Sequence, residues 1–120
     1  MAFQKVLCVD DVSADLINIE KIVTAAGHIV STAVNGKEAV SKAKAENPSI
    51  IFLDVNMPEM DGFAAMRELK KDPDTKLIPI VLVTSKNQKA DKLWAQMQGA
   101  NGFVSKPYTP EQITEHLRSL

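Results

Sequence analysis

Short apolar runs recur along the chain, and helical patterns separate them. The runs cover residues 6–9, 28–33, 50–53, 78–83 and 102–104. Several of them are apolar without alternation, which is typical of strands that are covered on both faces. Residues 50–53 form the most hydrophobic run, so we expect them to be the central strand. The pattern predicts five short strands.

After each run, apolar residues recur at spacings of three and four, as on one face of a helix. In the first helix Ser13 is the expected N-cap and Gly27 the expected residue after the C-cap. Asn35-Gly36 is expected to begin the second helix. The second helix is expected to place Ala39, Val40 and Ala43 inward, and the fifth to bury Ile113 and Leu117. One face of the third helix carries Phe63, Met66 and Leu69, and one face of the fourth (residues 88–98) carries Leu93 and Met97.

Alternating strands and helices predict one α/β domain. Parallel neighbours need helical crossovers, and these are right-handed, so helices are expected on both faces of a doubly wound parallel sheet. The 120 residues suit a single domain, which we expect to span 1–120.

Composition narrows the classes of function. The net charge of -1 gives no basic excess for binding nucleic acid nonspecifically, and no apolar run reaches the roughly 18 residues of a spanning helix. The lone cysteine, Cys8, lies in an apolar run and is expected to be a buried structural thiol. We therefore expect a cytoplasmic protein that neither binds nucleic acid nor inserts into a membrane.

Polar residues follow the predicted strands where the crevice of an open α/β sheet lies, beyond the carboxyl ends of the strands. Asp10 and Asp11 follow the first strand, Asp54 the third, Thr84 the fourth and Lys106 the fifth. Each has an ordinary alternative reading: a helix cap, a turn acid, a strand end or a solvated cation. Together they converge as the parts of a site do.

The energetics of this cluster point to a metal and to phosphoryl transfer. Three carboxylates about 6 Å apart repel by about 3 kcal/mol per pair at an effective dielectric near 20, so one must be protonated or a cation must bind. Oxygen ligands favour Mg²⁺, whereas zinc sites in proteins usually include His or Cys ligands. Lys106 suits a phosphoryl oxygen, Thr84 can donate to another, and Asp54 becomes a candidate nucleophile that forms an acyl phosphate.

The whole chain resembles the receiver domain of two-component response regulators, of the single-domain chemotaxis (CheY-like) type. The resemblance rests on Val9-Asp10-Asp11, Leu53-Asp54-Val55-Asn56-Met57-Pro58 with Met60-Asp61-Gly62, Val83-Thr84-Ser85, and Gly99-Ala100 followed by Phe103 and Lys106-Pro107. It implies a flavodoxin-like (βα)5 fold with strand order 2-1-3-4-5 and no effector domain.

The resemblance also implies a phosphorylation switch. Asp54 would accept a phosphoryl group from a CheA-like sensor histidine kinase, with Mg²⁺ held by Asp11, Asp54, the backbone carbonyl of Asn56 and, through water, Asp10. Lys106 would pair with the phosphoryl group, and the Lys106-Pro107 bond would be cis. The protein would catalyse only its own phosphorylation and dephosphorylation. It would be a monomer.

Thr84 and Phe103 would then alter the face made by the fourth helix, fifth strand and fifth helix, where an unnamed protein partner binds. Phe103 is matched by position only, and its alternative is a core phenylalanine. Asn56 and Lys86 occupy positions that tune dephosphorylation in the family.

The segment around Trp94 resembles twitching-motility (PilH-like) regulators of type IV pilus systems. Its alternative is a half-buried helix aromatic. Lys86, Lys89 and Lys92 are either a basic rim of the output face or a solvated helix face.

Two rival functions stay open. A phosphohydrolase or phosphomutase could use the same aspartyl phosphate, although Asp54-Val55-Asn56 departs from the usual D-x-D and no cap domain follows. A degenerate receiver or a phosphate sink is the second rival, and a sink would have the same sequence.

Overall fold

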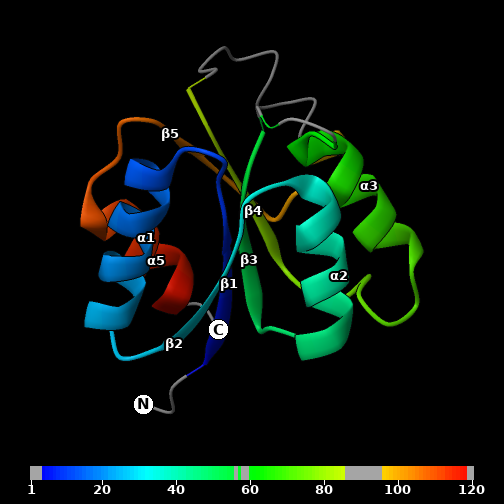
Figure 1. Ribbon diagram of the computed structural model, residues 1–120, viewed down its shortest axis with the longest axis horizontal. Coiled ribbons are helices and arrows are strands. Elements are labelled where there is room, and N and C mark those ends of the chain that lie inside the picture. The colour runs from blue at the N-terminus through cyan, green and yellow to red at the C-terminus, as the bar shows by residue number, and fades with distance from the viewer. Residues whose placement is uncertain (1–3, 56, 58–59, 86–95, 119–120) are drawn as a thin grey trace.

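Five parallel strands form one sheet in the order β2-β1-β3-β4-β5 (Figure 1). The computed structural model describes residues 4–55, 57, 60–85 and 96–118. The strands are β1 (Lys5–Val9), β2 (Ile29–Ala33), β3 (Ile50–Asp54), β4 (Ile80–Thr84) and β5 (Gly102–Ser105). The predicted strands, their order and the central place of residues 50–53 are confirmed.

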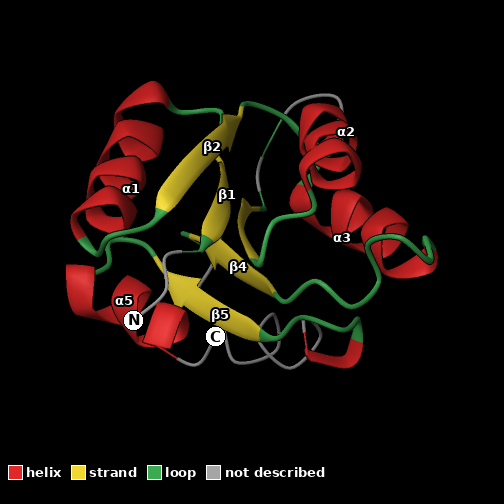
Figure 2. Cartoon of the chain, turned by 90° about the horizontal axis from the view of Figure 1, so that it is seen from below, coloured by secondary structure: helices red, strands yellow, loops and turns green. Residues whose placement is uncertain are grey.

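Successive residues of each inner strand face opposite layers. Ile51 and Leu53 of β3 belong to the core cluster that includes residues of α2 and α3, whereas Ile50 and Phe52 belong to the cluster that includes residues of α1 and α5. Figure 2 shows the same division, with α1 and α5 on one side of the sheet and α2 and α3 on the other. Burial on both faces explains why these strands are uninterrupted apolar runs.

The described helices begin and end close to the predicted positions. They are α1 (Ser13–Ala25), α2 (Gly36–Glu46), α3 (Gly62–Lys71) and α5 (Pro110–Arg118). The Asn35 side chain accepts the Glu38 N–H at the start of α2, and Thr109 and Gln112 form a capping box before α5. Gly27, with φ of 94°, follows the C-cap of α1 as expected.

The expected cap of α1 is wrong. Val12 is the N-cap, its carbonyl accepts the Leu16 N–H, and Ser13 is already helical. The Asp10 side chain accepts the Val12 N–H at 2.9 Å. This bond shapes the turn that Ser13 was expected to shape.

Most of the predicted fourth helix lies outside the described residues. Gln96 and Met97 are helical, and Gly99 follows with φ of 103°. Met97 is 75% exposed, and Leu93, which was expected on the same helix face, lies outside the described residues. Across the described residues, no helix has the length and apolar character needed to cross a membrane.

Candidate functional site

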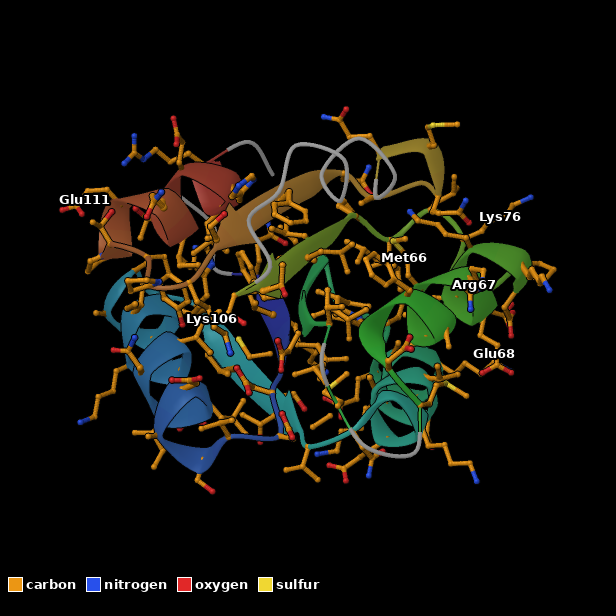
Figure 3. All side chains as sticks on the ribbon, turned by 90° about the horizontal axis from the view of Figure 1, so that it is seen from above. Met66, Arg67, Glu68, Lys76, Lys106 and Glu111 are labelled. Atoms are coloured by element: carbon orange, nitrogen blue, oxygen red, sulfur yellow. The ribbon has the colours of Figure 1, made fainter. Side chains whose placement is uncertain are left out.

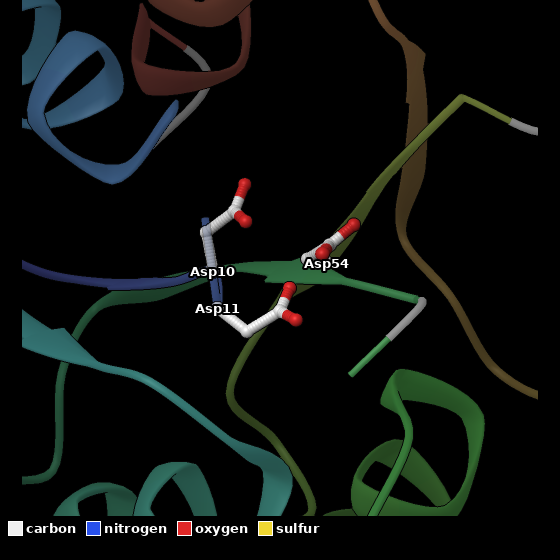
Figure 4. Close-up of side chains that lie close together, drawn as sticks. All are labelled: Asp10, Asp11 and Asp54. Atoms are coloured by element: carbon white, nitrogen blue, oxygen red, sulfur yellow. The ribbon is translucent and has the colours of Figure 1, made fainter. Parts of the chain in front are cut away.

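Three carboxylates meet at the carboxyl ends of β1 and β3 (Figure 4). Val9 aligns with Leu53 in the parallel register, so Asp10, the next residue, lies beside Asp54. One oxygen from each of Asp10, Asp11 and Asp54 lies within 4.8 Å of the others. The cluster that the sequence predicts is therefore present, and it is tighter than the expected 6 Å.

Burial makes the negative charge of this cluster energetically unfavourable. Asp10 and Asp54 are each 4% exposed, while Asp11 is exposed to solvent. Desolvation and the neighbouring Asp10 charge raise the pKa of Asp54 to about 7, although Lys106 and the Val55 N–H oppose the rise. A cation among these oxygens would remove the repulsion.

Lys106 supplies part of that positive charge, and Figure 3 shows it on the side of the molecule where α1 lies. Its Nζ donates to Asp10 Oδ2 at 2.7 Å and to Asp15 Oδ2 at 3.0 Å, and it lies 3.6 Å from Asp54 Oδ1. Burial alone would lower the pKa of Lys106, but the bonds to Asp10 and Asp15 and the charge of Asp54 raise it overall. Lys106 is therefore a permanent cation at the site.

The backbone holds Lys106 next to the strand ends. Its N–H donates to the Thr84 carbonyl at 2.8 Å, and the Lys106–Pro107 peptide bond is cis, as the resemblance implies. Thr84, the last residue of β4, is buried one position beyond the β4 residue that aligns with Asp54. The structure thus brings Thr84, Lys106 and the acidic cluster to one edge of the sheet.

Phe103 lies in β5 opposite Leu82 of β4. It is half-buried and packs against the core cluster that Leu82 belongs to. Its side chain therefore packs on the face of the sheet that α2 and α3 cover. Asn56, Lys86, Lys89 and Trp94 lie outside the described residues.

Two glycines hold the loop after β3 in place, a role that the sequence alone does not reveal. A β-carbon on Gly62 would lie 2.2 Å from the Asp54 carbonyl oxygen, and one on Gly36 would lie 2.1 Å from the Met60 carbonyl oxygen. The Gly62 N–H donates to Val55 O, and the Gly36 N–H donates to Met60 O. Both helices can start this close to the loop because glycine has no side chain.

Asp15 is a site residue that the sequence alone does not reveal. It lies in the first turn of α1, where an acidic residue is common because it complements the helix dipole. Its spacing from Asp10 therefore carries little signal. Tyr108, which has a side-chain hydrogen bond to Asn18 of α1, was also not predicted. Burial raises the pKa of Tyr108.

The donor set fits a hard divalent cation. All three members of the cluster are aspartates, and carboxylate oxygens are ligands that Mg²⁺ prefers. The exposed Asp11 leaves the cluster open to solvent on one side. Asp10, Asp11 and Asp54 can hold such an ion.

Known proteins share this architecture. The family model of the response regulator receiver domain matches residues 6–118. The chain is 34% identical to protein PilH of Pseudomonas aeruginosa over 116 residues, which cover 97% of this chain and 96% of PilH. Several other curated relatives are longer, and the chain spans less than half of them.

Solved structures agree with this assignment. The chemotaxis protein CheY4 of Vibrio cholerae has a TM-score of 0.91 and 33% identity, with 98% of each chain covered. The receiver domain of the sensor histidine kinase PA1611 of Pseudomonas aeruginosa, solved with a magnesium ion coordinated in the active site cleft, has a TM-score of 0.90 and 25% identity, with 98% of this chain and 97% of that chain covered. On the strength of its acidic cluster, its lysine and these matches, the chain belongs to the response regulator receiver domain family.

Proposed function

We propose that this chain is a cytoplasmic, single-domain phosphoacceptor switch whose acceptor is Asp54. The observation that carries the proposal is the position of Asp54: it is buried, lies within 4.8 Å of two other aspartates and is 3.6 Å from the Lys106 ammonium. Receiver domains take phosphoryl groups from histidine kinases, so a CheA-like sensor kinase is the proposed donor.

The metal in this proposal is Mg²⁺. Asp10, Asp11 and Asp54 would hold it together with the backbone carbonyl of Asn56, which lies outside the described residues. The magnesium ion in the related PA1611 receiver supports this assignment. When bound, Mg²⁺ neutralises the carboxylates and withdraws charge from phosphoryl oxygens.

The proposed transfer is a substitution at phosphorus. A carboxylate oxygen of Asp54 forms the new O–P bond, the N–P bond of a phosphohistidine breaks, and its electron pair stays on the imidazole nitrogen. The Lys106 ammonium and the Thr84 hydroxyl then pair with phosphoryl oxygens. Attack by water on phosphorus later releases phosphate and restores the Asp54 carboxylate.

The proposed output follows from these contacts. Movement of Thr84 toward the phosphoryl group would draw Phe103 inward and change the β5–α5 side of the molecule, to which a protein partner binds. The similarity to PilH and to CheY4 supports a role in chemotaxis or twitching motility. Trp94, Lys86 and Lys89 would contribute to this surface, and Asn56 and Lys86 would set the rate of dephosphorylation.

Mass spectrometry of the intact protein tests this proposal. With acetyl phosphate and Mg²⁺ the wild-type chain should gain one phosphoryl group, and this gain should be absent in Asp54→Ala and in EDTA. A wild-type chain that stays unmodified while it still binds its partner would indicate a degenerate receiver. Continuous release of phosphate from a sugar phosphate would instead indicate a phosphohydrolase.

A further inference from the structure

Lys106 is hydrogen-bonded to two carboxylates, and neither is the proposed phosphoacceptor. Its Nζ is 2.7 Å from Asp10 and 3.0 Å from Asp15, whereas Asp54 lies at 3.6 Å, beyond hydrogen-bond distance. Asp15 comes from the first turn of α1 and is not a member of the three-carboxylate cluster. The lysine is thus drawn toward α1 and away from Asp54.

The carboxylates of Asp10, Asp15 and Asp54 differ in how strongly each would be destabilised if Lys106 moved away. The side chains of Asp10 and Asp54 are 6% and 5% exposed, so an unpaired charge there has little water to solvate it. The Asp15 side chain is 43% exposed, so water can replace the ammonium. Asp15 is therefore the partner that gives up Lys106 most readily.

The space next to this pair allows the exchange. A hollow of about 330 Å³ lies between α1 and the loop after β5, and its walls are Asp15, Asn18, Ser85, Lys106, Pro107 and Tyr108. Among these six residues, Asp15 has the one carboxyl group and Lys106 the one amine. Solvent in the hollow can therefore reach the Asp15 carboxylate as Lys106 leaves it.

We propose that Asp15 is a positioning residue that holds Lys106 on the α1 side of the site, so that phosphorylation of Asp54 must draw the lysine away from it. This inference rests on the proposed phosphorylation of Asp54. Asp15 makes no contact with the phosphoryl group in this scheme. It acts through Lys106 and shifts the balance toward the unphosphorylated state.

Two measurements on one set of variants test the role. The variants are Asp15→Asn, Lys106→Met, the double variant, Asp15→Glu as the charge-retaining substitution, and Glu20→Gln as a control that removes one charge from α1 elsewhere. Urea unfolding in EDTA gives the coupling between residues 15 and 106 without metal. Titration with beryllofluoride in Mg²⁺, followed by NMR, gives the affinity for a phosphoryl mimic.

The expected affinity of Asp15→Asn for beryllofluoride is about twofold to fivefold higher than that of wild type, the range that a half-exposed ion pair supports. Asp15→Glu and Glu20→Gln should bind as wild type does. In the Lys106→Met background the Asp15→Asn effect should vanish, and the stability effects of the two substitutions should be non-additive.

Three results would overturn the role: an unchanged or weaker affinity in Asp15→Asn, an equal gain in the Lys106→Met background, or additive stability effects. An equal gain would mean that the Asp15 charge repels the anion directly. If wild type fails to bind beryllofluoride at all, the proposed phosphorylation is wrong. The unfolding measurements in EDTA still decide whether Asp15 holds Lys106.

Discussion

The α-carbon of Gly62 lies so close to Asp54 that a β-carbon on residue 62 would be 2.2 Å from the Asp54 carbonyl oxygen. The Gly62 N–H also donates to the Val55 carbonyl at 2.9 Å. The first residue of α3 is thereby fastened to the end of β3, where the proposed phosphoacceptor lies. Any side chain at position 62 must displace that backbone.

Gly62→Ala should therefore damage both stability and the site. The overlap is with main-chain atoms, which cannot swing aside, so we expect a loss of about 1–3 kcal/mol or more in the free energy of unfolding and slower labelling by acetyl phosphate. Gly27→Ala is the matched control: φ there is 94°, but nothing lies within 4 Å of the added carbon. It should cost about 1–2 kcal/mol and leave labelling unchanged. Equal labelling of both variants would refute the positional role of Gly62.

Asp54→Asn should stabilise the metal-free protein, and more so at pH 8 than at pH 5. The pKa of Asp54 is about 7, above the ordinary 3.8, so between these values the folded state binds a proton that the unfolded state lacks. Stability from this group is fully present below pH 3.8 and is lost as the pH rises through 7. Asparagine does not titrate.

Urea unfolding of wild type and Asp54→Asn in EDTA at the two pH values measures this effect. Saturating Mg²⁺ should reduce the pH dependence, because the cation favours the ionised carboxylate. A difference between the two proteins that is the same at pH 5 and pH 8 would contradict the raised pKa.

Lys106→Met should destabilise the metal-free protein, and Mg²⁺ should restore part of the loss. Removing the ammonium leaves the buried carboxylates of Asp10 and Asp54 without their cation, which we expect to cost about 3–5 kcal/mol before carboxylate protonation relieves it. Lys44→Met is the matched control, because Lys44 also lies 2.7 Å from a carboxylate, that of Asp72, but is 52% exposed. It should change stability little. The urea midpoints of both variants and of wild type, with and without Mg²⁺, measure these changes in stability. If Mg²⁺ stabilises Lys106→Met no more than it stabilises wild type, Lys106 and Mg²⁺ do not neutralise the same carboxylates.

Thr84→Ala should separate binding of a phosphoryl mimic from the change at Phe103. In wild type we expect beryllofluoride with Mg²⁺ to shift the aromatic NMR signals of Phe103, because the Thr84 hydroxyl would move toward the mimic. In Thr84→Ala the Asp54 signals should still shift while those of Phe103 stay near their starting positions. A full Phe103 shift in Thr84→Ala would rule out Thr84 as the link.

The uninterrupted apolar runs were enough to predict the sheet, because burial on both faces leaves a simple pattern. The acidic cluster could be predicted too, since parallel strands end at one edge, where Asp10 and Asp11 follow β1 and Asp54 is the last residue of β3. The N-cap of α1 could not be predicted, because the Asp10 side chain accepts the Val12 N–H and shapes the turn that Ser13 was expected to shape.

Contacts between distant segments left little trace in the sequence. Asp15 is an ordinary first-turn acid until the loop after β5 brings Lys106 within 3.0 Å of it. Gly62 reads as a helix start, and its close approach to Asp54 depends on how α3 docks against β3. Such roles need the packed structure.

Borohydride trapping followed by peptide sequencing tests the central claim most directly. Hydride from borohydride adds to the acyl carbon of an aspartyl phosphate and phosphate leaves, which gives an aldehyde. A second hydride and a proton from water then convert the aldehyde to the alcohol of homoserine. After treatment with acetyl phosphate and Mg²⁺, homoserine should replace Asp54 and no other aspartate, and it should be absent without Mg²⁺. Homoserine at Asp10 or Asp11, or an intact adduct that yields none at position 54, would contradict the assignment of Asp54 as the phosphoacceptor.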